Sequence, residues 1–190
     1  MRKINNAYER TRQKKIARIV NSGSVLDIGY AQLPNRYYSG IEAVGLDLEM
    51  PSEPSGYAEE IQGNALDLSR ALGNRRFDWI VAGEFIEHVR NPYDFLDSLH
   101  PFLKDNGRIV LSTPNPVGWP TLLFEWLQSK TRFYTEEHLY YFAPRWVHRM
   151  LDFTGFQPID TLAVGLWAPG IILPCPVALS YQVIYVAKPK

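Results

Sequence analysis

The feature that most constrains the fold of this chain is a series of short apolar runs that alternate with segments of helical spacing. The runs cover residues 24–28, 43–48, 77–82 and 107–112, and a weaker run ends near Gly63. Between the runs 77–82 and 107–112 the apolar residues have the spacing of a helix. We expect this helix to begin near Pro92 and to end at Asn106-Gly107. Strands that alternate with helices in this way indicate a parallel, doubly wound sheet.

The rest of the chain supplies an opening helix and a different kind of ending. The further predicted elements are an opening helix (4–20), two later helices (118–130 and 144–155) and two closing strands (157–164 and 183–187). We therefore predict an α/β fold with a three-layer, Rossmann-like doubly wound sheet, mostly parallel with an antiparallel last strand. One domain is expected over residues 1–190, with a lid-like insertion at about 114–143.

Composition excludes several classes of partner. The 190 residues include 20 basic and 20 acidic ones, so the net charge is zero and we expect no nucleic-acid partner. The lone cysteine, Cys175, rules out an internal disulfide, and we expect no metal site. The polar stretch 1–15 does not resemble a signal peptide, so a cytoplasmic location is expected. The sequence leaves the oligomeric state open.

Residues 162–179 form an uncharged stretch that is long enough to be considered as a membrane span. It contains Pro169, Pro174 and Pro176, and each proline removes a backbone donor and disturbs a helix. We therefore expect a loop between two strands and no membrane span. Peripheral contact with a membrane, or a lipid substrate, stays open as an alternative.

Polar and small residues follow the predicted strands at the edge where parallel strands end. They are Asp27, Gly29 and Tyr30 after the first strand, Asp47 and Leu48 at the second, Asn64 and Ala65 after the third, and Glu84, Glu87 and His88 after the fourth. Ligands of open parallel sheets bind outside the carboxyl ends of the strands. Asp47 follows Asp27 at about the spacing from which a carboxylate reaches both hydroxyls of a ribose. A nucleoside-type ligand is therefore predicted at this edge.

Six segments in the right order resemble the class I S-adenosylmethionine-dependent methyltransferases. They are VLDIG, AVGLDLE, GNALDL, FDWIVAGEFIEHVRNP, LKDNGRIVLSTPNP and HLYYFAPRWVHRMLDFTGF. The last three are similar to the subgroup that includes the ubiquinone-biosynthesis O-methyltransferases, in which an EHV triplet follows the fourth strand. The resemblance covers nearly the whole chain.

This resemblance implies S-adenosylmethionine as the cofactor and gives roles to the residues at the strand ends. Asp27 would anchor the methionine ammonium group indirectly, and Asp47 would bind the ribose. The Asn64 carbonyl and the Ala65 amide would bind the adenine. Neighbouring residues expected to contact the cofactor are Gly29, Tyr30, Leu48 and Glu84. Simpler structural roles stay open, since Asp27 could cap its turn and Asp47 could be a surface acid.

The loop after the first strand departs from the family pattern. Ala31 and Leu33 stand where further glycines are usual, and Pro34 restricts Leu33 to extended geometry. The segment before Asp47 is also short for a full helix. We predict a remodelled loop and a helix of about two turns or fewer. Because this cofactor carries no phosphate, the loop does not need a full cradle of backbone amides.

The candidates for catalysis are His138 and His88. His138 precedes an aromatic cluster, residues 140–142, that is expected to line an acceptor pocket. Either histidine could take the proton of a hydroxyl acceptor, and either could instead be a structural histidine. The acceptor is expected to be a small molecule that is methylated on oxygen or nitrogen. A sugar or a lipid-linked compound is one candidate.

Two other classes of function are alternatives to catalysis of methyl transfer. One is a methyltransferase-like protein that binds the cofactor without turnover, which the altered loop would suit. The other is a dinucleotide-dependent oxidoreductase, which is disfavoured because Ala31 and Leu33 leave no cradle for a pyrophosphate.

Overall fold

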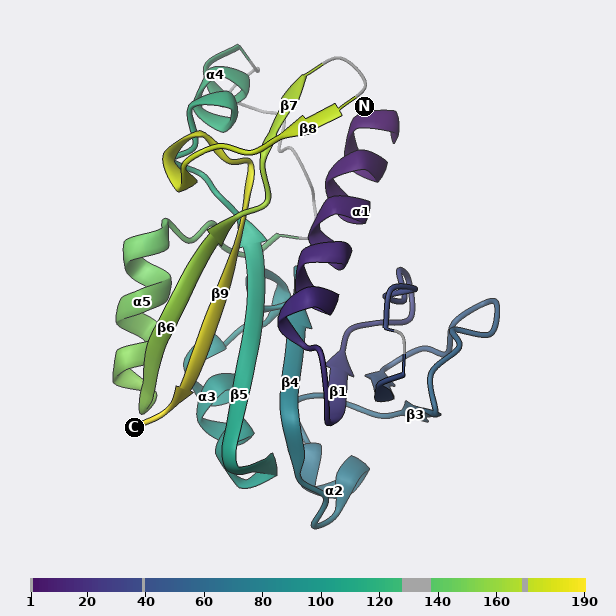
Figure 1. The fold of residues 1–190 in the computed structure, drawn as a ribbon. Helices are drawn as coiled ribbons and strands as arrows, with labels where there is room; N and C mark the ends of the chain where they lie inside the picture. The colour runs from purple at the N-terminus through teal and green to yellow at the C-terminus, as the bar shows by residue number, and fades with distance from the viewer. Residues whose placement is uncertain (1, 39, 128–137, 169–170) are drawn as a thin grey trace.

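A computed structural model describes residues 2–38, 40–127, 138–168 and 171–190. Its main sheet has seven strands in the order β3-β2-β1-β4-β5-β9-β6 (Figure 1). They are β1 (Ser24–Ile28), β2 (Glu42–Asp47), β3 (Glu59–Gln62), β4 (Phe77–Gly83), β5 (Leu103–Pro114), β6 (Phe156–Ala163) and β9 (Gln182–Pro189). The pairs among β1–β5 are parallel, and β9 runs antiparallel to both of its neighbours. The predicted fold class is confirmed.

Helices cover both faces of the sheet and make it the middle of three layers. They are α1 (Arg2–Ile19), α2 (Leu68–Leu72), α3 (Pro92–Leu99), α4 (Trp119–Leu127) and α5 (Pro144–Phe153), with short 3₁₀ turns at Ile86–His88, His100–Phe102 and Val177–Leu179. One core cluster joins α1 to the face of the sheet that carries Val25, Val81 and Val110. The other joins α2, α3 and α5 to the face that carries Leu26, Ile80 and Ile109. The side chains of alternate residues in each strand therefore pack against opposite helical layers.

The helix after β4 ends earlier than predicted. It stops at Leu99, a 3₁₀ turn containing Pro101 follows, and Leu103 already pairs with Phe77 as the first residue of β5. Proline in that turn removes a backbone donor and breaks the helix. The prediction that the helix reaches Asn106-Gly107 is therefore wrong, because both residues lie inside β5.

The short helix predicted between β1 and β2 is also absent. None of the described residues in this connection, 29–38 and 40–41, is helical. Two turns replace the helix, closed by hydrogen bonds from the Leu33 amide to the Tyr30 carbonyl and from the Tyr38 amide to the Asn35 carbonyl. Pro34 lies between these turns and prevents a continuous helix through them. The expectation of a remodelled loop holds, but that of a helix is wrong.

The uncharged stretch 162–179 has more structure than the predicted loop. After the end of β6, strands β7 (Leu166–Ala168) and β8 (Ile171–Leu173) form a small antiparallel hairpin, and β8 lies beside α1 (Figure 1). Of the helices in the described ranges, none has the length and apolar character needed to cross a membrane.

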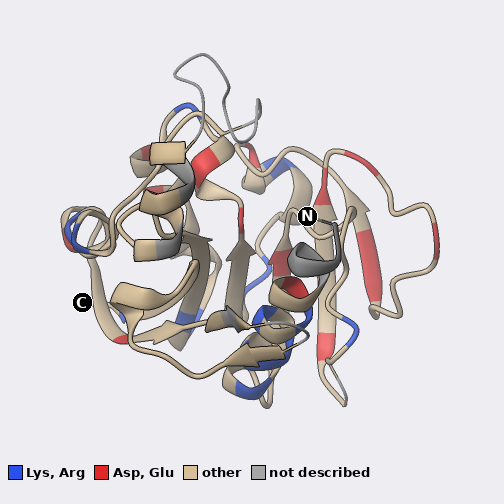
Figure 2. Ribbon diagram, turned by 90° about the horizontal axis from the view of Figure 1, so that it is seen from above, with Lys and Arg blue, Asp and Glu red and all other residues tan. Residues whose placement is uncertain are grey.

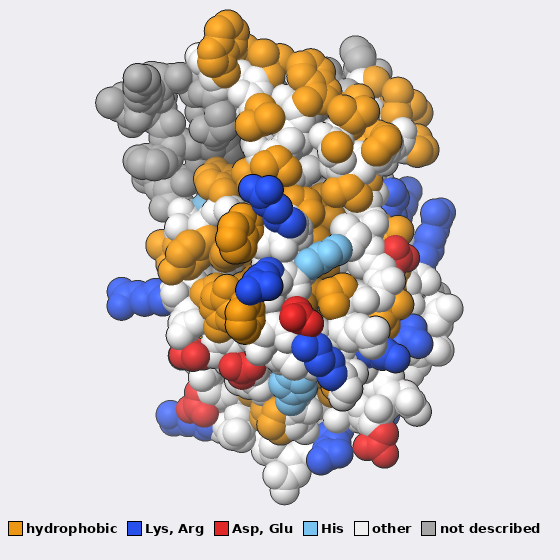
Figure 3. All heavy atoms as spheres, turned by 90° about the vertical axis from the view of Figure 1, so that its left-hand side faces the viewer, with side chains coloured by type: hydrophobic (Ala, Val, Ile, Leu, Met, Phe, Trp, Pro, Cys, Tyr) orange, Lys and Arg blue, Asp and Glu red, His pale blue; other side chains and the backbone are white. Residues whose placement is uncertain are grey.

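Of the region predicted as a lid, α4 lies above the main sheet in the view of Figure 1. The structure describes α4 and the segment 138–143, whereas residues 128–137 fall outside the described ranges, including the last three residues of the helix predicted over 118–130. Figure 3 shows apolar side chains over the top of the molecule, where α4 and the β7–β8 hairpin lie. The exposed apolar residues on these elements are Trp119, Leu122, Leu123, Trp126, Leu127, Ile171 and Leu173. The lid itself stays a prediction.

Candidate cofactor and acceptor site

A cavity of about 250 Å³ lies between α1 and the carboxyl ends of β1 and β4. Figure 2 looks down on this end of the molecule, and acidic segments gather beside α1 and on the side of β2 and β3. Of the predicted site residues, the cavity is lined by Asp27, Gly29, Tyr30, Glu84 and His88. Those predicted at the site that do not line it are Asp47, Leu48, Asn64, Ala65 and His138.

Asp27 is the buried acid of this cavity. Its Oδ2 accepts a hydrogen bond of 2.7 Å from the Tyr57 hydroxyl. Burial raises the pKa of Asp27 to about 6, although the Tyr57 hydroxyl, the charge of Arg12 and the Tyr38 hydroxyl each lower it. Asp27 is therefore largely ionised at neutral pH and can accept a ligand ammonium group.

Gly29 ends the first motif in a conformation that suits glycine. Its φ is +73°, and a Cβ at this position would lie 2.8 Å from the Phe85 ring. The next residue, Tyr30, turns its side chain into the core, where it is almost fully buried. Tyr30 therefore lines the cavity from below the loop.

Asp47 lies at the end of β2 and holds the remodelled loop. Its Oδ2 accepts from the Ala31 amide at 2.9 Å, and its Oδ1 accepts from the Glu49 amide at 3.3 Å. The alternative that the sequence left open for Asp47 was a surface acid, whereas its carboxylate is half-buried and binds two backbone amides. Each carboxylate oxygen retains a second lone pair, and the half-buried side chain can also accept from a ligand hydroxyl. Leu48 beside it is exposed.

Asn64 and Ala65 follow β3 farther from the cavity. The Asn64 side-chain oxygen already accepts from the Leu66 amide at 2.9 Å, which forms an Asx turn. The Ala65 side chain is buried, and the Asp67 side chain, which precedes α2, does not cap that helix. Any adenine contact by Asn64 must share the oxygen used in this turn.

Arg12 is a residue of the cavity that sequence reasoning missed. Its guanidinium is buried, pairs with Glu9, and donates to the Ser112 hydroxyl at 3.3 Å. The sequence showed Arg12 only as part of a short basic stretch, and Ser112 is 100 residues away. No local pattern could place this cation inside the protein.

Glu84 completes the charged lining. It has a φ of +53°, which is unusual for a residue other than glycine. Its carboxyl group accepts from Ser112 Oγ at 3.3 Å and from Gln182 Nε2 at 2.9 Å. Burial raises its pKa, while the nearby Arg12 charge lowers it. Carboxylates and a guanidinium therefore line one cavity, which is the donor and acceptor set that an amino-acid group requires.

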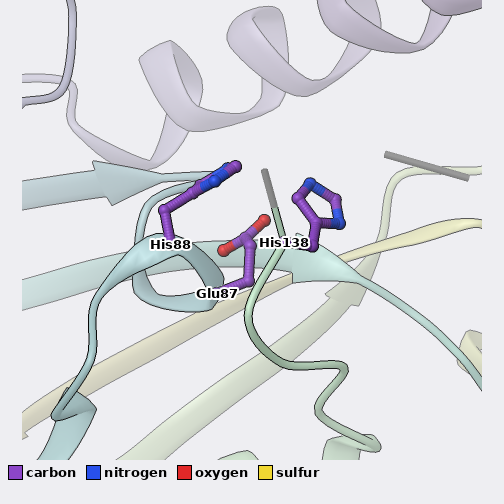
Figure 4. Close-up of side chains that lie close together, drawn as sticks. All are labelled: Glu87, His88 and His138. Carbon is purple, nitrogen blue, oxygen red and sulfur yellow. The ribbon is translucent and has the colours of Figure 1, made fainter. Parts of the chain in front are cut away.

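A second cluster lies beside the cavity and contains both predicted catalytic histidines. Glu87, His88 and His138 each offer one ligand atom, and these atoms lie within 4.8 Å of one another (Figure 4). Glu87 and His88 come from the 3₁₀ turn after β4. The Leu139 and Tyr140 amides donate to the Glu87 carbonyl at 2.9 and 3.3 Å, which brings His138 next to that turn.

The Glu87 carboxyl group is the unusual member of this cluster. Its side chain is almost fully buried, and neither oxygen has a hydrogen-bond partner among the described residues. Burial raises its pKa well above the ordinary value. A carboxylate with two imidazoles is a common set of ligands for divalent cations. The single cysteine argues only against a cysteine-rich metal site, whereas these three residues form a candidate cation site without cysteine.

Comparison with known proteins identifies the family. A family model described as a methyltransferase domain matches residues 2–161. The chain belongs to this family. The predicted resemblance to class I S-adenosylmethionine-dependent methyltransferases is thereby confirmed.

Relatives of this methyltransferase-family protein include the predicted subgroup. The ubiquinone biosynthesis O-methyltransferase of Cereibacter sphaeroides is 25% identical over 133 residues, which cover 64% of this chain and 53% of that protein. The mitochondrial enzyme of the same name from Schizosaccharomyces pombe is 30% identical over 104 residues, which cover 53% of this chain and 38% of that protein. The chain spans about half or less of the length of these relatives.

A solved structure confirms the fold. The 1,6-didemethyltoxoflavin-N1-methyltransferase of Burkholderia thailandensis superposes with a TM-score of 0.70 and 19% identity, covering 98% of this chain and 80% of that one. At this level of identity the likeness shows the Rossmann-like fold alone.

Proposed function

We propose that this protein transfers a methyl group from S-adenosylmethionine to a hydroxyl group of a small molecule. The observation that carries the proposal is the charged cavity at the ends of β1 and β4, in which Asp27 and Glu84 oppose Arg12. The methionine part of the cofactor is an amino acid, and it needs a carboxylate for its ammonium group and a cation for its carboxylate. Family membership and the bound S-adenosylhomocysteine of the Burkholderia protein support the same cofactor.

The remaining predicted contacts extend from this cavity along the strand ends. Asp27 would hold the ammonium group, the backbone at Gly29 and Tyr30 would border the methionine part, and Asp47 with Leu48 would meet the ribose. Asn64 and Ala65 would border the adenine. The bound cofactor supplies a methyl group on a positively charged sulfur, and the protein has to position an acceptor oxygen in line with it.

We place the acceptor at the Glu87–His88–His138 cluster and propose that the cluster holds a divalent cation. A histidine base alone would leave the buried Glu87 carboxyl group without a partner, which is costly for a charged form. A cation bound by the three side chains would compensate that charge and lower the pKa of an acceptor hydroxyl group. His138 and His88 would then act as ligands, and a role as general base is the alternative.

Turnover tests the activity, and the cluster can be tested separately. With S-adenosylmethionine and a panel of phenols, catechols and amines, we expect formation of S-adenosylhomocysteine with a hydroxyl acceptor. Cofactor binding without turnover on any acceptor would favour the second candidate, a binding protein, which the glycine-poor loop supports. Turnover with amines alone would contradict O-methylation.

Cation binding is measured without any acceptor. We expect Mn²⁺, Mg²⁺ or Zn²⁺ to raise the melting temperature of the wild type, because a ligand selective for the folded state stabilises it. Glu87→Gln and His138→Ala should each abolish this increase, and His148→Gln, which changes a histidine outside the cluster, should retain it. If activity survives removal of metal by a chelator but falls about 100-fold in His138→Ala, the general-base alternative holds.

A further inference from the structure

Three tyrosines fill the space that the missing helix between β1 and β2 leaves beside the sheet. The Tyr30 and Tyr57 rings stack with centroids 5.1 Å apart, and the Tyr38 ring lies 5.8 Å from that of Tyr57. Tyr30 lies directly over Gly45 of β2, where a Cβ would be 2.5 Å from the ring. Gly45 is the register partner of Asp27, so the aromatic cluster lies against the cofactor edge of the sheet.

Tyr57 is the member of the cluster that reaches the cofactor site through a polar atom. Its hydroxyl donates to Asp27 Oδ2 at 2.7 Å and accepts from the Asn35 backbone amide at 2.8 Å. Tyr57 belongs to the connection between β2 and β3, and its own amide donates to Ser55 Oγ at 3.0 Å. One hydroxyl therefore joins the first strand, the remodelled loop and a second loop.

We infer that Tyr57 is a positioning residue for the cofactor, whose hydroxyl orients Asp27 and keeps its carboxylate ionised to receive the ammonium group. This inference rests on the proposed cofactor site. In the family pattern a glycine-rich turn leads into a helix here, whereas Ala31, Leu33 and Pro34 occupy this turn and no described residue of the connection is helical. The orientation of Asp27 then depends on a side chain from the next loop.

The charges around Asp27 explain why one hydroxyl matters. The groups that face it are Tyr57 and Tyr38 from the two loops, Arg12 from α1 and Asp47 from β2. Burial and Asp47 raise the pKa of Asp27, and the two hydroxyls and Arg12 lower it, with about 6 as the result. Removal of the Tyr57 hydroxyl leaves the burial unchanged and takes away a stabilising donor. The pKa of Asp27 then rises, and the carboxylate becomes protonated at a pH where the wild type is ionised.

The test compares Tyr57→Phe with the wild type by titration with S-adenosylhomocysteine from pH 5.5 to 8.5. The phenylalanine retains the ring stack on Tyr30 and removes only the hydroxyl. We expect the pH at which affinity is lost to increase by about one unit, so that the variant binds about threefold more weakly at pH 6.5, about eightfold more weakly at pH 5.5 and within about twofold of the wild type at pH 8.5. Titration of the ligand's own amino group affects both Kd values equally, so its effect cancels in the ratio of the Kd of the variant to that of the wild type.

Two controls separate positioning from structural support. Tyr37→Phe removes an exposed hydroxyl from the neighbouring connection between β1 and β2 and should bind like the wild type at every pH. Methylthioadenosine, which has the nucleoside but no ammonium group, should bind Tyr57→Phe with no pH-dependent difference from the wild type. If Tyr57→Phe folds poorly, Tyr38→Phe should move the pH profile in the same direction, because that hydroxyl also lowers the pKa of Asp27.

The outcomes that contradict the inference are distinct from those that contradict the cofactor site. An equal loss of affinity at every pH would mean that Tyr57 only supports the loop, and an unchanged profile would mean that it has no role. If the folded wild type binds no S-adenosylhomocysteine at any pH, the proposed function itself is overturned.

Discussion

Asp27 is the residue at which the proposed binding of a ligand and the stability of the free protein favour opposite protonation states. Its folded pKa of about 6 lies above its ordinary value of 3.8 because the carboxyl group is buried. The folded protein therefore holds this proton more tightly than the unfolded chain does, and stability falls as the pH rises from about 4 to 6. A difference of about two pKa units corresponds to about 3 kcal/mol that an ionised Asp27 costs the ligand-free protein at neutral pH.

We expect Asp27→Asn to raise the melting temperature of the ligand-free protein at pH 7.5 and to weaken binding of S-adenosylhomocysteine. The gain in stability should shrink toward zero near pH 4, where the wild-type carboxyl group is already neutral. Thermal unfolding as a function of pH, with and without ligand, measures both effects. A lower melting temperature for the variant at pH 7.5 would show that hydrogen bonding to Asp27 outweighs its burial.

Asp78 provides a matched control, because its pKa is lowered whereas that of Asp27 is raised. Lys104 and Ser24 lower its pKa to about 2, so its contribution to stability is present above about pH 4 and is lost as the pH falls toward 2. Asp78→Asn should therefore lower the melting temperature at pH 7.5. Two aspartates of one sheet should thus respond in opposite directions to the same substitution.

The connection between β1 and β2 shows how a packed aromatic cluster replaces a helix. Gln13 of α1 donates through its side-chain amide to the carbonyls of Leu33 and Pro34 at 3.0 and 3.1 Å. These bonds attach the turn to α1, while Tyr30 attaches it to β2 above Gly45. Side chains from its surroundings hold this connection, and its described residues form neither a helix nor a strand.

We expect Gly45→Ala to destabilise the protein by about 1–3 kcal/mol, the usual cost of overpacking, and to weaken binding of S-adenosylhomocysteine. The added methyl group would lie 2.5–2.6 Å from three carbons of the Tyr30 ring and has to displace it. Denaturant unfolding of Gly45→Ala, Tyr30→Leu and the double variant measures the coupling. Additive effects of the two changes would mean that the clash is relieved elsewhere.

At the scale of the whole molecule, α1 closes the cavity proposed for the cofactor from one side. Lys15 donates to the Ala163 carbonyl at 2.7 Å, and Gln182 of β9 donates to Glu9 at 3.1 Å. Together with Arg12 at Ser112 of β5, these contacts connect the first helix to the last strands. A ligand in the cavity would contact α1, the remodelled loop and the central strands at once.

We expect S-adenosylhomocysteine to raise the melting temperature and to slow amide hydrogen exchange in both α1 and the 29–41 loop. At a ligand concentration of 100 times Kd the stabilisation should be about 2.7 kcal/mol. If the ligand slowed amide hydrogen exchange only in the loop after β3, that result would contradict binding in the cavity that α1 closes. Arg12→Lys should reduce protection of α1, because lysine cannot reproduce the planar guanidinium contacts.

The local sequence determined most of the elements and their order, although α2 and the β7–β8 hairpin were not predicted. The apolar runs that end at residues 28, 48 and 82 predicted the strand ends to within one residue, and helical spacing predicted α1, α4 and α5, since both patterns depend on residues close in the chain. The motifs also predicted the family and the edge of the sheet that holds the cavity. The helix boundary near Pro101 and the missing helix near Pro34 were misjudged because the length of a helix depends on what its surroundings can pack.

Only the tertiary structure decided which side chains meet at that edge. Tyr57 reaches Asp27 across 30 residues, and Arg12 reaches Ser112 across 100. Glu87 lies next to His138 because the backbone amides of Leu139 and Tyr140 donate hydrogen bonds to the Glu87 backbone carbonyl. Such contacts carry no periodicity in the sequence, because they form where separate elements pack and depend on burial and charge there. The sequence therefore determined where a site lies, and packing determined which groups occupy it and in which protonation state.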